Sequence, residues 1–284
     1  MEAKRQTVGK SQSQEVREGE CVSEAEILFE REGPVAVVTF NRPEFRNAMT
    51  WAMYDGLVEA CETVDADADI RVLIVRGAGG KAFVAGTDIG QFRTFSTPDD
   101  AIEYERRLER VLRRVEAVNK PTIAAIEGVA VGGGAALALA CDLRYCTPES
   151  RLGVPIARTL GNCLSVAIHA RLLDMLGPAR TKEILFRARL VGADEALQAG
   201  LVNEIVPSER LYSYVREVAE EIAGHAPITL QVTKEAVRRL QMYRRAVPDG
   251  ELGEDLIVRA YMSEDFREGV SAFLDKRKPV WRGK

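Results

Sequence analysis

The stretch Thr122 to Arg144, TIAAIEGVAVGGGAALALACDLR, constrains the fold of this chain more than any other. It opens on an apolar run at 122–126, bounded by Pro121 and Gly128, which is typical of a buried strand. The three glycines 132–134 then lead directly into small residues at 135–140, which predict a tightly packed helix. Such an entry leaves the first backbone amides of the helix open to a partly negative ligand atom.

A second turn repeats this design. Residues 81–90 read KAFVAGTDIG, and they lie between a predicted buried strand at 71–75 and a short predicted helix. Two strand-to-helix turns that each aim one N–H at a shared oxygen would form an oxyanion hole. The alternative is that both are glycine links that let a strand and a helix pack closely without any ligand.

The rest of the chain alternates predicted strands and helices before a helical tail. A hairpin is predicted at 26–31 and 35–40, helices at 50–65, from Pro98 to about 118 and at about 164–176, and a short strand at 143–147. From Leu211 onward the pattern is helical throughout. We therefore predict an α/β core at 25–206 and a C-terminal helical module at 207–284, after a polar tail at 1–24 that is expected to be disordered.

Segments in a fixed order and spacing point to a known family. They are NRPEFRNAM (41–49), AFVAGTDI (82–89), PTIAAIEGVAVGGGAALALACDLR (121–144), LGVP (152–155), GPARTKEILF (177–186), AGLVNEIV (199–206), APITLQVTKEAV (226–237) and AFLDKRKPVW (272–281). Across residues 26–281 the chain resembles the crotonase (enoyl-CoA hydratase/isomerase) superfamily. A match along the whole chain is far more specific than any lone motif.

The resemblance implies an α/β fold: a crotonase-like spiral of repeated strand-strand-helix turns, with a C-terminal helical trimerisation module. It also implies a homotrimer or a hexamer built as a dimer of trimers. No internal repeat is strong enough in the sequence to predict the spiral without the resemblance.

Composition restricts the partners and the setting. The net charge of −4 and the pI near 5.5 argue against a nucleic acid or an anionic membrane as the main partner. The five cysteines show no zinc-type spacing and there are only two histidines, so we predict no metal site. With no signal-peptide pattern and no long apolar stretch, a cytoplasmic location is expected.

The resemblance implies an acyl-CoA thioester as the substrate, with coenzyme A entering only as part of it and no tightly bound cofactor. Thr87 and Gly133 take the two positions whose N–H groups form the oxyanion hole of the family, which stabilises a thioester enolate. The CoA moiety is expected against Arg46, Ala85, Asp88, Ile89 and Lys276.

The usual acid and base of the family are missing. Typical hydratases use two glutamates, and their positions here hold Ala136 and Ile156, which transfer no proton. The segment 158–163, RTLGNC, replaces a glycine-rich PGAGG segment and brings polar groups close to the second position. The candidates for a relocated acid or base are Tyr104, Arg158 and Asn162, each with a structural role as the alternative.

Two further groups of candidates have simpler interpretations. Cys163 is a candidate nucleophile if it lies at a helix N-terminus, and a small buried cysteine is the alternative. The acids Glu103, Glu105 and Glu109 follow Pro98 on a helix that borders the acyl pocket in some family members. They are expected to be mostly surface charges.

The sequence therefore predicts an acyl-CoA-processing enzyme that is not a standard hydratase and that carries out isomerisation, decarboxylation or thioester hydrolysis. The alternative is a noncatalytic CoA-ester-binding protein. A pocket lined by Ala136, Ile156, Trp51 and Phe92 would suit an apolar or aromatic acyl group, whereas an inward Arg158 would favour an acyl carboxylate. The RGAGGKA segment at 76–82 resembles a dinucleotide fingerprint, but the apolar, glycine-broken residues after it cannot open the long helix that NAD binding needs.

Overall fold

The computed structural model describes residues 25–245 and 253–284 of the chain. The predicted disordered tail at 1–24 lies outside the described residues. No helix within the described ranges is long and apolar enough to cross a membrane.

A six-stranded sheet forms one layer of the molecule, in the order β1-β2-β3-β5-β7-β10. Only the β1–β2 pair is antiparallel. Alternate residues of β2, β3 and β5 pack into two different hydrophobic cores, one on each face, so these strands are apolar throughout. The strands are β1 (Ile27–Glu32), β2 (Val35–Phe40), β3 (Val72–Gly77), β5 (Thr122–Ile126), β7 (Leu143–Cys146) and β10 (Glu204–Ile205).

A second, smaller sheet has the order β4-β6-β8-β9. Its first three strands each follow a strand of the large sheet after a sharp corner, and a helix follows each of them. Three strand-strand-helix turns in succession therefore form the predicted spiral. At the corner between β5 and β6, Gly128 has φ +71, and a side chain there would collide with the carbonyl of Lys81. The strands are β4 (Ala82–Val84), β6 (Val129–Val131), β8 (Arg151–Gly153) and β9 (Val191–Gly192).

Helices cover one face of the large sheet. Helix α1 (Trp51–Ala66) packs beside α2 (Pro98–Glu116), and α2 packs on the buried α3 (Gly133–Ala140). Local sequence sets the helix starts: the side chain of Thr50 caps α1, and Thr97 forms a reciprocal capping box with Asp100 before α2. The elements between α3 and the C-terminal helices are α4 (Ile156–Thr159), α5 (Val166–Phe186) and α6 (Ala193–Gln198).

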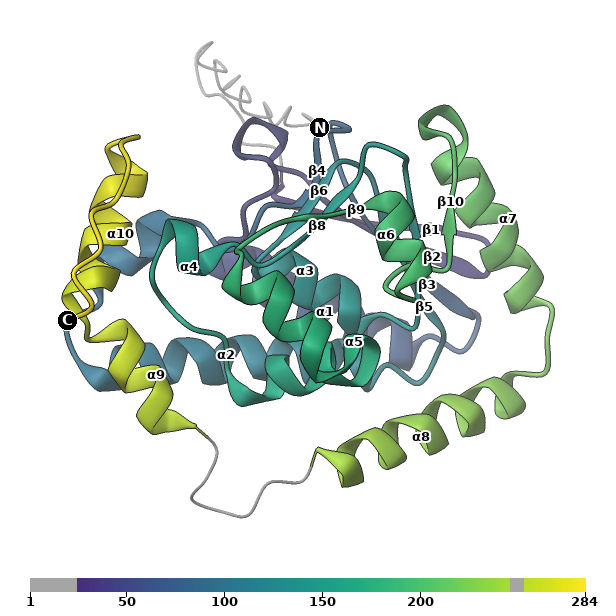
Figure 1. Cartoon of the computed structure of the whole chain (residues 1–284). Coiled ribbons are helices and arrows are strands. Elements are labelled where there is room, and N and C mark those ends of the chain that lie inside the picture. The colour runs from purple at the N-terminus through teal and green to yellow at the C-terminus, as the bar shows by residue number, and fades with distance from the viewer. Residues whose placement is uncertain (1–24, 246–252) are drawn as a thin grey trace, which may run out of the picture.

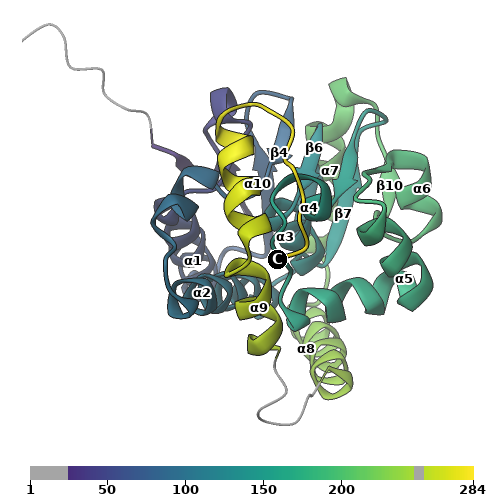
Figure 2. The same cartoon turned by 60° about the vertical axis from the view of Figure 1, so that its left-hand side comes forward.

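The C-terminal helices make three different kinds of contact. Helix α7 (Leu211–Ala223) packs on the face of the large sheet opposite α1. Helix α8 (Pro227–Arg244) buries no residue and stands apart from both sheets (Figure 1). Helices α9 (Glu254–Tyr261) and α10 (Glu264–Leu274) return to the core, where α9 contacts α2 and α10 contacts α4 (Figure 2).

Some predicted elements differ from the structure. The short helix expected after Thr87 is the 3-10 helix η2 (Ile89–Thr94). The helix predicted at 164–176 continues as α5 to residue 186, but its backbone breaks at Gly177, where φ is +68 and ψ is 170. The break explains why the sequence pattern stops there, because a glycine followed by a proline usually ends a helix.

Candidate active site

The two glycine-containing turns lie next to each other. A Cβ atom added to Gly133 would be 3.6 Å from Oγ1 and 4.0 Å from the backbone nitrogen of Thr87. Gly133 is the first residue of α3, and Thr87 follows β4 closely in the chain. The spiral therefore brings together the two positions that the sequence analysis paired.

Neighbouring backbone contacts hold both turns and leave their amides available. Met49 accepts the N–H of Asp88 and donates its own N–H to Gly86, at 2.9 and 2.8 Å, so this bridge uses the residues on either side of Thr87. Within the described residues, no backbone hydrogen bond outside the regular elements uses the N–H of Thr87 or Gly133. Two amides of this kind could stabilise a shared oxyanion.

The glycines around Gly133 are required by the geometry. Gly132 has φ +58, in the left-handed region that favours glycine. A side chain at Gly134 would run into the carbonyl of Val84 on the neighbouring strand. The glycine triplet therefore allows α3 to begin directly against β4.

A cluster of hydroxyl groups borders the two turns. Oγ1 of Thr87 lies 2.7 Å from the hydroxyl of Tyr54 and 2.9 Å from that of Tyr104. The Tyr54 hydroxyl would be 3.1 Å from a Cβ on Gly133. Burial raises the pKa of both phenols, which therefore stay protonated at neutral pH.

Sequence reasoning singled out Tyr104 but missed Tyr54. The available signal was its place one turn after Trp51 on a helix next to the NRPEFRNAM loop. A tyrosine on such a helix face is usually part of a core, so only the spatial contact reveals its polar role.

The two positions that hold glutamates in typical hydratases carry no ionisable side chain in this protein. Ala136 is 1% exposed within α3, and Ile156 is the half-buried first residue of α4. Proton transfer at this site would therefore have to come from other side chains.

Aromatic rings from five elements pack beside the hydroxyl cluster. The ring of Tyr104 lies 5.8 Å from Trp51 and 4.9 Å from Phe92, measured between centroids. The predicted lining residues Trp51 and Phe92 therefore meet around Tyr104. The full set of rings is Trp51, Tyr54, Phe92, Phe95, Tyr104, Tyr261 and Phe266.

Glu105 corrects an expectation from the sequence, because it is buried rather than at the surface. It is 4% exposed, and its Oε1 accepts a hydrogen bond of 2.7 Å from the hydroxyl of Tyr261 on α9. The same hydroxyl accepts a bond of 3.1 Å from Nδ2 of Asn162. Burial outweighs the hydrogen bond from Tyr261 and raises the pKa of Glu105 to about 7.

The other acids on α2 behave differently from Glu105. Glu103 is exposed and pairs with Arg110, whereas the half-buried Glu109 pairs with Arg171. The surface expectation therefore holds for Glu103 alone. Helix α2 was predicted correctly, but the sequence did not show that Glu105 lies on the buried face of the helix and not on its charged face.

The remaining candidates of the 158–163 segment fall in different surroundings. Arg158 is exposed on α4 and forms no side-chain hydrogen bond or ion pair with the described residues. Asn162 joins the Tyr261 hydroxyl as described. Burial raises the pKa of Cys163 to about 12, which disfavours the thiolate that a nucleophile requires.

The positions expected to border CoA lie on three segments. The carbonyl of Arg46 accepts the N–H of Ala85 at 3.1 Å, which ties the first loop to the turn before Thr87. Asp88 caps η2 by accepting the N–H of Gly90 at 3.0 Å, and Ile89 is the first residue of that helix. The side chain of Lys276 is exposed just beyond α10.

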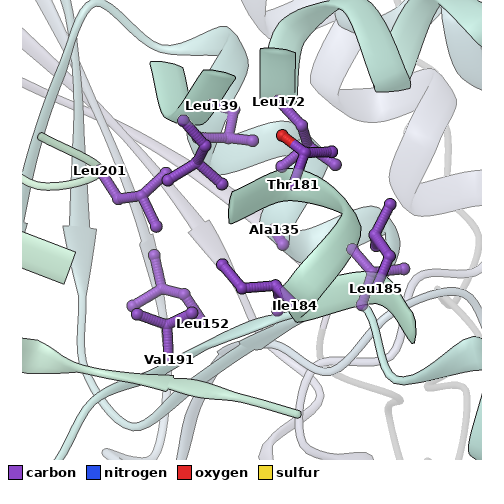
Figure 3. Close-up of a pocket in the computed structure, with 12 residues that line it drawn as sticks. Ala135, Leu139, Leu152, Leu172, Thr181, Ile184, Leu185, Val191 and Leu201 are labelled. Atoms are coloured by element: carbon purple, nitrogen blue, oxygen red, sulfur yellow. The ribbon is translucent and has the colours of Figure 1, made fainter. Parts of the chain in front are cut away.

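A small apolar cavity lies between residues of α3, α5, β8 and β9 (Figure 3). It encloses about 30 Å³, which is too small for an acyl group. Its hydroxyl group, Oγ1 of Thr181, has no hydrogen-bond partner among the described residues. The residues labelled around it include Ala135, Leu139, Leu152, Leu172, Ile184 and Leu201.

Comparison with known families agrees with this fold. A family model described as "Enoyl-CoA hydratase/isomerase" matches residues 30–284. The chain therefore belongs to the enoyl-CoA hydratase/isomerase family of acyl-CoA enzymes. It is 33% identical to the short-chain-enoyl-CoA hydratase of Clostridium acetobutylicum, over 89% of this chain and 95% of that protein.

Two solved structures illustrate the range of similar proteins. An enoyl-CoA hydratase/carnithine racemase from Magnetospirillum magneticum is 38% identical with a TM-score of 0.74, covering 92% of this chain and 97% of that chain. A methylmalonyl-CoA decarboxylase in complex with 2-nitronate-propionyl-CoA is 29% identical with a TM-score of 0.84, covering 92% of this chain and 100% of that chain. The second backbone is the more similar despite its lower sequence identity.

Proposed function

We propose that this protein forms a thioester enolate by decarboxylating an acyl-CoA that carries a carboxylate on Cα. The thioester oxygen would lie between the N–H groups of Thr87 and Gly133. The observation that carries the proposal is the pairing of these two turns in a site where Ala136 and Ile156 stand in place of both glutamates. Such a site can stabilise negative charge but lacks the usual groups for activating water.

Decarboxylation suits this set of residues because breaking the bond requires no base. The electron pair of the bond between Cα and the carboxylate moves into the thioester to form the enolate, and carbon dioxide leaves. The enolate then takes one proton at Cα from a neutral donor. Hydration instead needs a group to activate water and a group to protonate Cα, which are the roles of the missing glutamates.

The surroundings of the site favour both steps. Aromatic rings beside the hole would replace water around the substrate carboxylate, which destabilises its charge relative to neutral carbon dioxide. Tyr54 and Tyr104 have raised pKa values and can donate protons as neutral phenols. The similarity to a methylmalonyl-CoA decarboxylase structure, at a TM-score of 0.84, supports the same reaction type.

Coenzyme A would enter only as part of the substrate, with no tightly bound cofactor. Its nucleotide would lie along the exposed Arg46 and the turn that holds Asp88, with Lys276 as a further cation for its phosphates. Ala85 and Ile89 would offer backbone contacts on either side of Thr87.

The proposal can be tested with purified protein and two panels of thioesters in heavy water. One panel holds acyl-CoAs with a carboxylate on Cα, and the other holds 2-enoyl-CoAs. We expect the first panel to lose carbon dioxide and gain one deuterium at Cα by mass spectrometry, while the second stays unchanged. Water added to the second panel alone would contradict the proposal, and tight binding of thioesters that are all recovered unchanged would favour the noncatalytic binder.

We also propose that α8 holds the protein in a homotrimer, or in a hexamer of two trimers. None of the α8 residues is fully buried within its own chain, and the helix exposes Ile228, Val232, Val237, Leu240 and Met242. Apolar side chains gathered on one exposed helix typically mark an interface. Replacing Leu240, which is 65% exposed, with glutamate places a charge in that interface.

We expect Leu240→Glu to shift the sedimentation coefficient from the oligomer to the monomer, because burying an unpaired charge opposes association. Leu197→Glu, at an exposed leucine on α6, is the matched control and should leave the oligomer intact. An oligomer that survives in Leu240→Glu, or a wild type that is monomeric, would contradict the role given to α8.

A further inference from the structure

We propose that Glu105 is the proton reservoir of this site, taking protons from an outer groove and passing them through Tyr261 to the phenols beside the thioester. The inference rests on the proposed function, since an enolate formed by decarboxylation must be protonated in every turnover. It assigns the proton supply that the missing glutamates leave open. Glu105 lies between the aromatic cluster and this outer groove.

On its inner side, Glu105 is joined to the aromatic cluster through one hydroxyl group. The Tyr261 hydroxyl donates to Oε1 of Glu105 at 2.7 Å, and the ring of Tyr261 lies 6.0 Å from that of Tyr104. Tyr104 in turn contacts Oγ1 of Thr87 at 2.9 Å. No hydrogen bond joins the Tyr261 hydroxyl to either phenol hydroxyl among the described residues, so the proposed route includes a water between Tyr261 and Tyr104.

On its outer side, Glu105 lines a groove of about 680 Å³ between α2, α5, α8 and α9. Its second oxygen, Oε2, is buried and accepts no hydrogen bond within the usual distance among the described residues, although the nearby backbone N–H of Ser165 acts to lower the pKa of Glu105. An oxygen without such a bond can carry a proton while Oε1 continues to accept from Tyr261. The groove connects this carboxyl group to the outside of the chain.

The charges around Glu105 favour a group that gains and loses a proton. The titratable groups close enough for Glu105 and them to change one another's pKa include Tyr54 of α1, Glu109 of α2, Cys163 and Tyr261 of α9. None of these carries a positive charge that would hold Glu105 ionised. The arginines lining the groove form ion pairs with other carboxylates; they are Arg106, Arg110, Arg113, Arg171, Arg238 and Arg245.

The proton balance of the step is simple. A phenol gives its proton to Cα of the enolate and becomes a phenolate. Glu105 then gives its proton, through the hydroxyl of Tyr261, to restore the phenol, and the carboxylate is protonated again from the groove. Transfer from Glu105 to a phenolate is downhill, because the pKa of Glu105 is about 7 and the pKa values of the phenols lie above their ordinary value.

The sign of the pH dependence follows from this order. Glu105 is protonated below its pKa of about 7, so the reservoir is full at lower pH and empties as the pH rises through that value. We expect the kcat of the wild type to fall above pH 7 with a single titration. Glu105→Gln keeps an oxygen that accepts from Tyr261 but holds no exchangeable acid proton, so its kcat should be at least about 10-fold lower and flat over the same range.

Tyr261→Phe tests the route rather than the acid. It keeps the ring but removes the hydroxyl group, so we expect the same loss as in Glu105→Gln. The double variant should lose no more than either single variant, because both break one path. Glu103→Gln is the matched control on the exposed face of α2, and its pH profile should equal that of the wild type.

A measurement without substrate keeps the inference separate from the proposed function. The infrared band of a protonated carboxyl group, in the difference between wild type and Glu105→Gln, should titrate near pH 7. A band that titrates in the ordinary range of a glutamate, or an unchanged pH profile in an active Glu105→Gln, would overturn the role of Glu105. Failure of the wild type to decarboxylate any substrate would instead overturn the proposed function.

Discussion

Replacing Gly133 with proline should lower the kcat for decarboxylation by about 100-fold relative to Gly133→Ala, since a single oxyanion donor is typically worth this much. Proline lacks the N–H group that would stabilise the thioester oxygen. It is tolerated at the first position of a helix, which is where Gly133 lies in α3. The change therefore removes the donor and keeps the helix start.

Gly133→Ala is the matched control because it adds a Cβ atom but keeps the amide. That atom would lie 3.1 Å from the hydroxyl of Tyr54, a tight contact that both variants share. The difference between the two variants thus isolates the N–H group. We expect their affinities for CoA esters, measured by calorimetry, to agree within a few-fold, and equal kcat values would show that the Gly133 amide takes no part in the reaction.

The sequence predicted those parts of the site that depend on local backbone pattern. The strand at 122–126 was predicted at the bounds it has, and the glycine-triplet turn lies next to Thr87, as expected. Both features follow from short stretches in which glycine marks a place without room for a side chain. Whether the two amides bind a thioester stays a prediction.

The side chains that complete the site could not be predicted in the same way. Glu105 on α2 accepts a hydrogen bond from Tyr261 on α9, which lies 156 residues further along the chain. The periodicity of a sequence does not predict a contact at this separation. The second sheet was missed because its strands have only two or three residues, too few to show an alternating pattern. The contact between Glu105 and Tyr261 and the second sheet therefore depend on packing between distant parts of the chain, which local sequence patterns do not predict.

The largest expected effect on stability comes from Arg171, which joins α5 to α2. Its side chain is 3% exposed and bonds two carboxylates, Glu116 at 2.8 Å and Glu109 at 2.7 Å. Arg171→Met would leave both glutamates without their buried partner. We expect the free energy of unfolding to fall by about 3 kcal/mol, measured by urea denaturation at neutral pH.

The pH dependence of this loss distinguishes a charge effect from a packing effect. Burial acts to raise the pKa of Glu116, but the hydrogen bonds and charge of Arg171 outweigh it and lower the pKa below its ordinary value. The ion pair therefore stabilises the wild type fully at a pH above the pKa that Glu116 has in the unfolded chain. This stabilisation is lost as the pH falls through the lower pKa of the folded state. In Arg171→Met, Glu109 and Glu116 can take up protons as the pH falls, which removes their unpaired charges. The difference in the free energy of unfolding between wild type and variant should therefore become smaller at acidic pH. Arg110→Met, at an exposed pair with Glu103, should change stability by less than about 0.5 kcal/mol. A constant difference at every pH would mean that Arg171 acts through its packing alone.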